Sequence, residues 1–234
     1  MQHLLLLHGA LGAAEQLQPL SETLSSTYIV HSINFYGHGG VNDIEEFTIE
    51  QFANQIYHYL LENKIDKANI AGYSMGGYVA LYLAKQHPEK INKIFTLATK
   101  FLWTPAIAEQ EIKLLNPEKI TEKLPAFAST LEKRHAPNDW KALLKKTAKL
   151  MTGLGDQPVL TTEDFQKIEQ PILISIGDKD TMVSLEETID VYRKLKHGYL
   201  LVLPATPHPI EKVDMKRLAE EINLFFTTNE KAKV

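Results

Sequence analysis

The chain has 234 residues, of which 44% are hydrophobic and 23% charged, a composition typical of a globular protein with one large domain or two small ones. A formal net charge of -4 and the lack of a long basic run argue against nucleic acid or an anionic membrane as a partner. The absence of cysteine excludes disulfides and thiolate metal sites, and it is compatible with a reducing compartment.

The first apolar run covers residues 4–7 and is too short to span a membrane. His8 and Gly9 follow it at once, and no Lys or Arg precedes it. The segment therefore lacks both the charged region and the cleavage site of a secretory signal. We interpret it as a buried strand and expect a cytoplasmic protein.

Short apolar runs alternate along the chain with longer amphipathic stretches. The runs predict strands at residues 4–7, 28–33, 69–71, 94–98, 172–176 and 200–203. Apolar residues at helical spacing predict helices at residues 49–62, 78–86, 185–195 and 213–226. Because the strand runs are continuously apolar, we expect them to be buried on both faces, in a mostly parallel sheet of about six strands flanked by helices. The polar residues 227–234 are expected to fray.

The strand pattern stops between residues 100 and 170. Helical patterns at residues 106–115, 121–132 and 139–151 replace it, separated by prolines. An insertion at this place would stand over the carboxyl ends of the strands, where open α/β sheets carry their sites. We predict a core formed by residues 1–99 and 171–234 and a helical cap or lid formed by residues 100–170. The alternative is a peripheral helical unit that touches no ligand.

A G-x-S-x-G element, Gly72-Tyr73-Ser74-Met75-Gly76, lies between the third predicted strand and the next helix. Small residues two positions before and after the serine allow the sharp turn that such an element needs. The turn places the Ser74 hydroxyl at a helix N-terminus, where developing negative charge is stabilised. Alone, the five residues could be a simple connector, so Ser74 is a candidate nucleophile only if its partners are present.

A serine nucleophile needs a base that removes its proton and a carboxylate that orients the base. The predicted strand 172–176 ends in Gly177-Asp178-Lys179-Asp180, which offers two carboxylates. The loop after the last predicted strand holds His208 between two prolines. Serine, aspartate and histidine thus follow one another on successive strand ends. Taken singly, an aspartate there is more often a turn former, and nine histidines are present.

The reaction also needs two backbone N–H groups directed at the carbonyl oxygen as it becomes negative. Met75, the residue after the nucleophile, supplies one of them. The loop His8-Gly9-Ala10-Leu11-Gly12 after the first strand is suited to supply the other, with Ala10 as the predicted donor. We interpret His8 as a structural histidine that is hydrogen-bonded to the loop backbone.

These motifs together resemble the α/β-hydrolase family over essentially the whole chain. The resemblance is carried by His8-Gly9, Gly37-His38-Gly39, the turn at Ser74, Asp180 and His208. The first strand begins almost at Met1, whereas family members usually carry antiparallel strands before it. The expected sheet is therefore an N-terminally trimmed form of the family's.

The resemblance implies a role for each of these residues. Ser74 would be the nucleophile, and His208 the base. Asp180 would be the acid, because it fills the G-x-x-D position that begins at Gly177. The resemblance also implies that Ala10 and Met75 form the oxyanion hole and that the insertion forms a lid.

We predict a serine hydrolase, most simply a carboxylic ester hydrolase, that cleaves a small ester, thioester or lactone through an acyl-enzyme on Ser74. The substrate is expected to be a small molecule with an apolar acyl part. No cofactor, metal ion, nucleic acid or membrane span is expected. A serine at the turn argues against the chemistry of haloalkane dehalogenases and epoxide hydrolases, which need a carboxylate there. The rate should fall in acid as His208 takes up a proton.

Two other functions are compatible with the same residues. One is a ligand-binding, receptor-like member of the fold with little turnover, and the other is a carbon–carbon bond hydrolase or lyase. The pattern leaves the oligomeric state open. It also leaves open whether the aromatic residues of the insertion line an acyl pocket or form the insertion's own core: Phe101, Trp103, Phe127 and Trp140.

Overall fold

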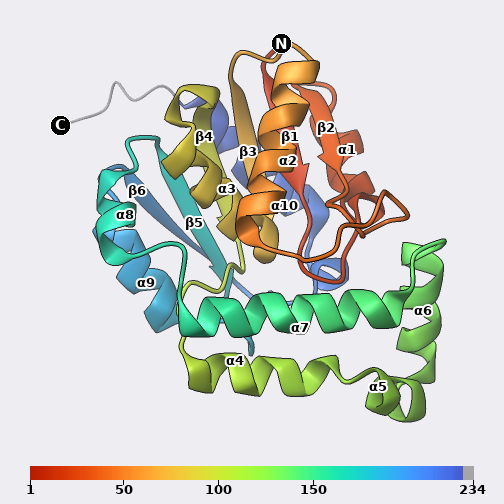
Figure 1. Ribbon diagram of the computed structural model, residues 1–234. Helices are drawn as coiled ribbons and strands as arrows, with labels where there is room; N and C mark the ends of the chain where they lie inside the picture. The colour runs from red at the N-terminus through yellow and green to blue at the C-terminus, as the bar shows by residue number, and fades with distance from the viewer. Residues whose placement is uncertain (229–234) are drawn as a thin grey trace.

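A computed structural model describes residues 1–228 and contains one parallel sheet with the strand order β2-β1-β3-β4-β5-β6 (Figure 1). The strands are β1 (His3–Leu7), β2 (Ile29–Ile33), β3 (Ala68–Tyr73), β4 (Ile91–Leu97), β5 (Ile172–Gly177) and β6 (Gly198–Leu203). The prediction of a six-stranded parallel sheet is confirmed, and each predicted run overlaps one of these strands, with Tyr28 and Ala98 just outside. Residues 227–234 were expected to fray, and most of them, residues 229–234, lie outside the described residues.

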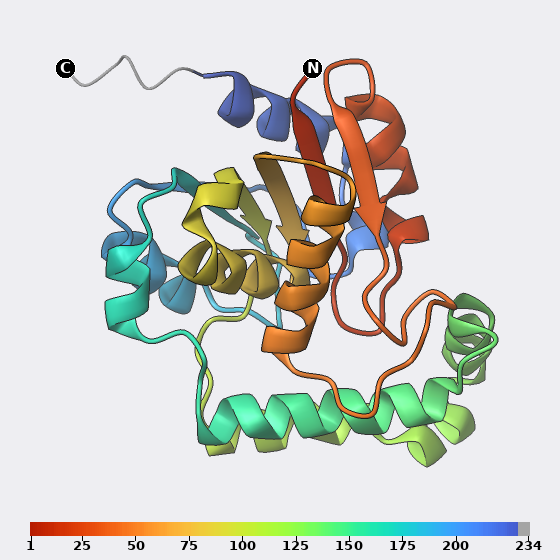
Figure 2. The same cartoon turned by 45° about the horizontal axis from the view of Figure 1, so that its top comes forward.

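Helices cover both faces of the sheet, as Figure 2 shows. On one face lie α2 (Ile49–Glu62), α3 (Met75–Gln86) and α9 (Leu185–Lys194). On the other lie α1 (Gln18–Leu24) and α10 (Met215–Thr227). Strand β1 explains the continuous apolar runs, because Leu5 and Leu7 pack into the first of these cores while Leu4 and Leu6 pack into the second.

The helices begin where the sequence offers a cap. Thr48 accepts a hydrogen bond from the Gln51 backbone N–H at the start of α2, and Ser184 forms a capping box with Glu187 at the start of α9. The helix that was predicted at residues 49–62 has those bounds in the structure. Among the described residues no helix is long and apolar enough to cross a lipid bilayer.

Residues 100–170 contain helices and no strand. They are α4 (Pro105–Ile112), α5 (Pro117–Lys123), α6 (Pro125–His135), α7 (Trp140–Asp156) and α8 (Thr162–Lys167). The single helix predicted over residues 121–132 is wrong, because Pro125 ends one helix and begins the next. The short helix α8 was not predicted.

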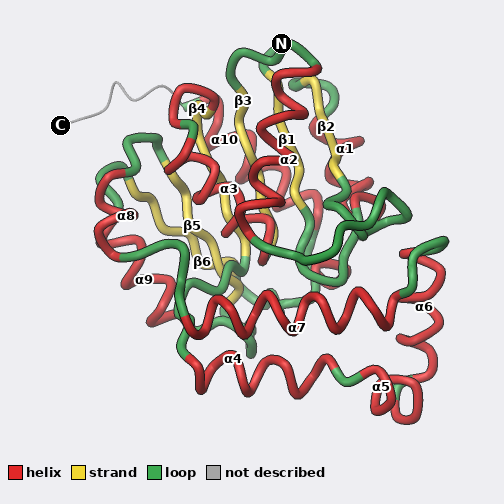
Figure 3. The backbone as a smooth tube through the Cα atoms, in the orientation of Figure 1, coloured by secondary structure: helices red, strands yellow, loops and turns green. Residues whose placement is uncertain are grey.

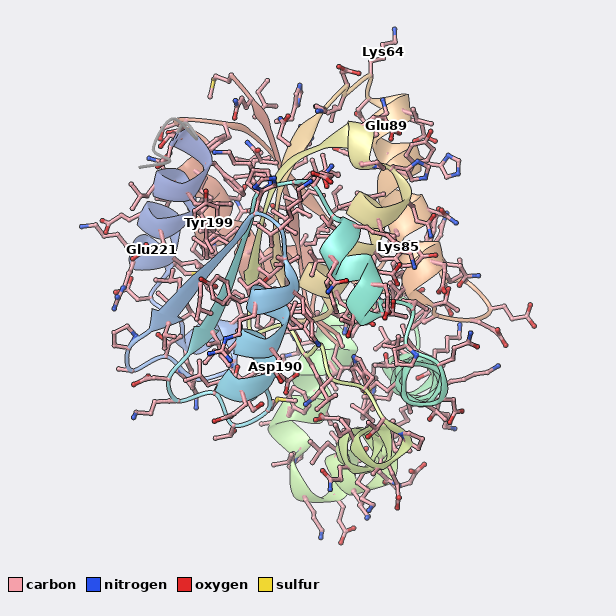
Figure 4. All side chains as sticks on the ribbon, turned by 90° about the vertical axis from the view of Figure 1, so that its left-hand side faces the viewer. Lys64, Lys85, Glu89, Asp190, Tyr199 and Glu221 are labelled. Atoms are coloured by element: carbon pink, nitrogen blue, oxygen red, sulfur yellow. The ribbon has the colours of Figure 1, made fainter. Side chains whose placement is uncertain are left out.

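The long helix α7 runs across the carboxyl end of the sheet, with α4 packed along it (Figures 1 and 3). The helix α8 instead lies beside the core. Lys85 of α3, labelled in Figure 4, forms an ion pair with Asp164 of α8 at 3.0 Å and donates a hydrogen bond to the Val159 carbonyl. The end of the segment is thus attached to α3 of the core.

Candidate active site

Ser74 is the single residue between the end of β3 and the start of α3. Its φ of 51° and ψ of -117° lie in a region that side chains other than glycine rarely adopt. Three hydrogen bonds fix this conformation: the Ser74 N–H donates to the Leu97 carbonyl at 2.8 Å, and its carbonyl accepts from Gly77 N–H and Thr99 Oγ1 at 3.0 Å each. The end of β4, the first turn of α3 and Thr99 therefore hold the half-buried serine in a strained turn.

The glycines of the motif are required by close backbone contacts. A Cβ atom on Gly76 would lie 2.4 Å from the Leu7 carbonyl oxygen, at the end of β1. A Cβ atom on Gly72 would lie 2.5 Å from the backbone nitrogen of Gly77. The turn packs directly against the neighbouring strand, as the G-x-S-x-G pattern predicted.

We expect Gly76→Ala to lower the reactivity of Ser74 by about 100-fold. The added methyl group meets backbone, which cannot rotate away, so the serine must shift, and a shift of about 1 Å costs on the order of 10²-fold in rate. Labelling by a fluorophosphonate and the melting temperature should both fall. The matched control is Gly153→Ala in α7, where nothing lies within 4 Å of the added atom. Labelling of Gly76→Ala at the wild-type rate would contradict this account.

The structure brings Asp180 and His208 together. His208 Nδ1 lies 2.8 Å from Asp180 Oδ2, and the other carboxylate oxygen accepts the N–H groups of Met182 and Val183 at 2.8 and 2.9 Å. Burial would raise the pKa of Asp180, but the hydrogen bonds from His208 and the two backbone groups outweigh it, and the pKa lies below its usual value. The carboxylate is therefore charged and fixes the ring with Nε2 free.

Asp178, the other carboxylate of the loop, has a different environment. Its Oδ1 accepts the Thr206 N–H at 3.3 Å, and its Oδ2 lies 3.5 Å from Lys179 Nζ. Its side chain is 36% exposed, whereas that of Asp180 is 1% exposed. Of the two carboxylates that the sequence offered, only Asp180 contacts the histidine.

Tyr73 contacts His208, and the sequence did not predict this contact. Its hydroxyl donates to the His208 carbonyl at 3.0 Å, and the two ring centroids lie 5.6 Å apart. Burial raises the pKa of Tyr73, so the hydroxyl remains a neutral donor. Its position directly before Ser74 was the only signal in the sequence.

Ser74, His208, Ala10 and Met75 all line one cavity of about 60 Å³. Met75 is the first residue of α3, where a backbone N–H has no acceptor within the helix. A hydrogen bond between Ser74 Oγ and His208 Nε2 is not among those formed by the described residues, and such contacts often tighten only when substrate binds. Four of the five residues predicted for the site therefore line the same cavity.

The walls of this cavity are largely apolar and come from both the core and the insertion. Trp103, Leu150, Met151 and Leu154 belong to residues 100–170. A second cavity, of about 400 Å³, adjoins the first along a shared wall that includes Ile49 of α2. Helix α7 thus contributes Leu150 and Leu154 to the walls of both cavities.

Two charged side chains also line the cavity, and neither was predicted. Lys100 Nζ lies 3.4 Å from Glu111 Oε1, and both side chains are mostly buried. Lys100 also donates to the carbonyl of Met182, two residues after Asp180, at 2.8 Å. Their signal in the sequence was only their place at the entry to the insertion.

Only two of the four aromatic residues take one of the roles that the sequence left open, because Phe101 packs in the main core and Phe127 lies in neither place. Trp103 lines the cavity. Trp140 lies in the insertion's own core with Leu131 and Leu144, and Phe101 packs against Phe165. Phe127 is exposed.

His8 is bonded to loop backbone, as predicted. Its Nδ1 donates to the Gly9 carbonyl at 2.7 Å, and its Nε2 accepts the Phe35 N–H at 3.1 Å.

Among residues 1–228 no group of three or more His, Cys, Asp or Glu side chains is arranged to hold a metal ion.

The arrangement defines a class of enzyme: a parallel α/β sheet with a strained serine after a central strand and an aspartate–histidine pair after the two strands at one edge. The sequence profile of the alpha/beta hydrolase fold family matches residues 2–118. The chain belongs to the α/β-hydrolase family and is a hydrolase enzyme.

Individual relatives agree with this assignment. The chain is 27% identical over 224 residues to the pimeloyl-[acyl-carrier protein] methyl ester esterase of Neisseria meningitidis serogroup C, covering 87% of this chain and 85% of the relative. The crystal structure of MGS-M2, an alpha/beta hydrolase from a Medee basin deep-sea metagenome library, matches with a TM-score of 0.82 at 17% identity, over 100% of this chain and 92% of that one. An enol-lactonase from Burkholderia xenovorans LB400 matches with a TM-score of 0.76, also at 17% identity, over 97% and 92%. The two structures support the fold alone.

Proposed function

We propose that this protein is a serine carboxylic ester hydrolase in which Ser74 is the nucleophile, His208 the base and Asp180 the carboxylate that orients it. The contact of 2.8 Å between His208 and the buried Asp180, beside the cavity that Ser74 lines, carries the proposal. The backbone N–H groups of Ala10 and Met75 would bind the oxyanion. The alternative partner, Asp178, does not reach the ring.

The proposed reaction has two halves. His208 Nε2 takes the proton of Ser74 Oγ as this oxygen bonds to the ester carbonyl carbon, and the carbonyl oxygen becomes negative between the two N–H donors. The tetrahedral species collapses, and the alcohol leaves with the proton from His208. A water molecule then gives its proton to His208 and attacks the acyl-enzyme, which releases the carboxylic acid and restores Ser74.

Residues 100–170 would act as a cap over a core formed by residues 1–99 and 171–234. Support comes from Trp103 of the insertion and from Leu150 and Met151 of α7, which line the same cavity as Ser74. Together with Tyr78 of α3 they form an apolar wall that excludes water from the acyl-enzyme. The alternative of a peripheral helical unit is less consistent with these contacts.

The substrate class that we propose is an ester with an apolar acyl part and a small alcohol. The cavity of about 60 Å³ beside Ser74 suits a compact leaving group, and its walls suit hydrocarbon. The relatives named as methyl ester esterases make methyl esters of acyl chains the first compounds to test. Thioesters and lactones of the same acyl length complete the panel.

The test is intact-mass spectrometry after treatment with a fluorophosphonate probe. We expect one adduct on the wild-type protein, none on Ser74→Ala and slow formation on His208→Ala. The ester panel is then assayed with the same proteins, and the products are identified by mass. Ester turnover that survives in Ser74→Ala would contradict the proposal. Tight ligand binding without repeated turnover would favour a receptor-like protein, and carbon–carbon cleavage products would favour the lyase alternative.

A further inference from the structure

The end of α6 is hydrogen-bonded to the loop that carries Ala10. His135 Nε2 donates to the Leu11 carbonyl at 3.1 Å, and Arg134 Nη1 donates to the same oxygen at 3.2 Å. Leu11 directly follows Ala10 and has a φ of 58°, which a leucine rarely adopts. Two side chains of the proposed cap thus converge on the carbonyl of a strained residue in the proposed oxyanion loop.

The ring of His135 is fixed from both sides. Its Nδ1 accepts the Gly39 N–H at 3.1 Å while its Nε2 donates to Leu11, so the ring must be neutral with its proton on Nε2. The side chain is fully buried, and burial lowers the pKa of His135 to about 4. The histidine therefore joins the Gly37-His38-Gly39 loop to the oxyanion loop as a fixed spacer.

Arg134 connects the same carbonyl to the loop that carries His208. Its Nε lies 3.2 Å from Glu15 Oε1, and its Nη2 lies 3.4 Å from Glu211 Oε1, in the turn that follows His208. Only 10% of the Arg134 side chain is exposed. The donors of a planar guanidinium are spread over three nitrogens in fixed directions, so it can reach three separate acceptors, whereas a lysine has one nitrogen from which to reach them.

The side chain of Leu11 is held by the same segment. It packs against the small apolar cluster of the insertion, which contains Leu131 of α6 and Trp140 of α7. Both the carbonyl and the side chain of Leu11 are therefore anchored by residues 100–170. In contrast, the N–H of Gly12 donates a hydrogen bond within the loop, to the Gly9 carbonyl at 3.1 Å.

We propose that Arg134 and His135 are positioning residues that set the direction of the Ala10 N–H by holding Leu11 in its left-handed conformation. The insertion then has a second role besides enclosing the substrate, because it completes the oxyanion hole. This inference rests on the proposed serine-hydrolase function. The simpler alternative is that both side chains only attach the insertion to the core, and the two accounts differ in what their loss does to transition-state binding.

Matched substitutions separate the two hydrogen bonds of His135. In His135→Gln the longer side chain can still donate to the Leu11 carbonyl, whereas in His135→Asn the shorter one can only replace the acceptor for Gly39. Arg134→Met removes the second donor, and Arg134→Lys keeps the charge. Lys133→Met, an exposed neighbour on α6, is the control.

The readouts are kcat and KM for the best ester and the inhibition constant of a trifluoromethyl ketone of the same acyl length. This ketone adds to Ser74, and its oxygen occupies the oxyanion hole. We expect His135→Asn and Arg134→Met each to lower kcat about 10- to 100-fold with little change in KM, as expected for a small misplacement of a donor. Binding of the ketone should weaken by the same factor. His135→Gln should recover most of the loss, and Lys133→Met should match the wild type.

The inference would be overturned if His135→Asn and His135→Gln had equal kcat, or if ketone binding were unchanged while the melting temperature fell. If His135→Asn does not fold, kcat and the affinity for the ketone are compared in Arg134→Lys and His135→Gln. A loss of kcat without a matching loss of ketone affinity would then overturn the inference. Failure of the proposed function gives a different result, because the wild type itself would then show no serine adduct or Ser74→Ala would remain active.

Discussion

Asp180→Asn is expected to lower kcat by about 10⁴-fold while KM changes little, as in other serine, histidine and aspartate sites. Asp180 accepts a hydrogen bond from the Nδ1–H of His208 at 2.8 Å. Its negative charge stabilises the ring once Nε2 has taken the serine proton. An asparagine in this place has no charge, and its amide group favours the wrong tautomer of the ring. The loss should therefore appear in the chemical step and not in substrate binding.

Asp178→Asn is the matched control, because it removes a carboxylate from the same loop without touching His208. We expect it to stay within a few-fold of the wild type. The measurement is steady-state kinetics on the best ester at mildly alkaline pH, with the rate of fluorophosphonate labelling as a second readout. A fall of less than about 10-fold in Asp180→Asn, or equal losses in both variants, would assign the orienting role elsewhere.

The sheet was predictable because each strand carries its own evidence. Leu4, Leu5, Leu6 and Leu7 form an apolar run that is too short for a helix, and a strand covered on both faces buries all four. The helix α1 was missed because its seven residues are too few to establish a helical period. The helix predicted over residues 121–132 was wrong because periodicity was given more weight than the proline that interrupts it.

The candidate site was only partly predictable, for a reason of distance along the chain. Ser74 lies in a local motif, so that its turn and its glycines follow from five neighbouring residues. Asp178 and Asp180 are equivalent in the local sequence, and the family resemblance pointed to Asp180 before the contact with His208 was seen. The hydrogen bonds from Arg134 and His135 to Leu11 join residues more than a hundred positions apart. The spacing of apolar residues along the chain cannot indicate such a contact.

A second property that only the structure reveals is a cluster of three buried histidines: His8, His38 and His135. The ring centroids of His8 and His38 lie 5.1 Å apart, and those of His38 and His135 lie 5.7 Å apart. Burial lowers the pKa of His38 and of His135 to about 4, and burial followed by the nearby His38 lowers that of His8 well below its usual value. All three rings are therefore neutral in the folded protein at neutral pH.

This cluster should make the fold sensitive to acid. In the unfolded chain a histidine takes up a proton near pH 6.5, but in the folded protein His38 and His135 do so only near pH 4. Between these values the unfolded state binds more protons, so the free energy of unfolding falls as the pH falls. The full stability is present above pH 6.5, and about 3 kcal/mol for each of these two residues is lost by pH 4. The lowered pKa of Asp180 adds a further loss only at lower pH, as this carboxylate is protonated.

The test is urea denaturation at a series of pH values between 7 and 5, with His38→Phe as the main variant. Phenylalanine fits this position because the His38 ring packs against Phe35, Phe47 and Phe52, and its Nε2 has no hydrogen-bond partner among the described residues. The bond that Nδ1 donates to the Tyr36 carbonyl at 2.9 Å is lost at every pH, so its loss lowers the free energy of unfolding without changing the slope. Removing one titrating group should reduce the slope of the free energy of unfolding against pH by about 1 kcal/mol per pH unit. His58→Gln, at an exposed position of α2, is the control for the loss of a histidine outside the cluster. If His38→Phe kept the wild-type slope, the acid sensitivity would have to arise outside the cluster.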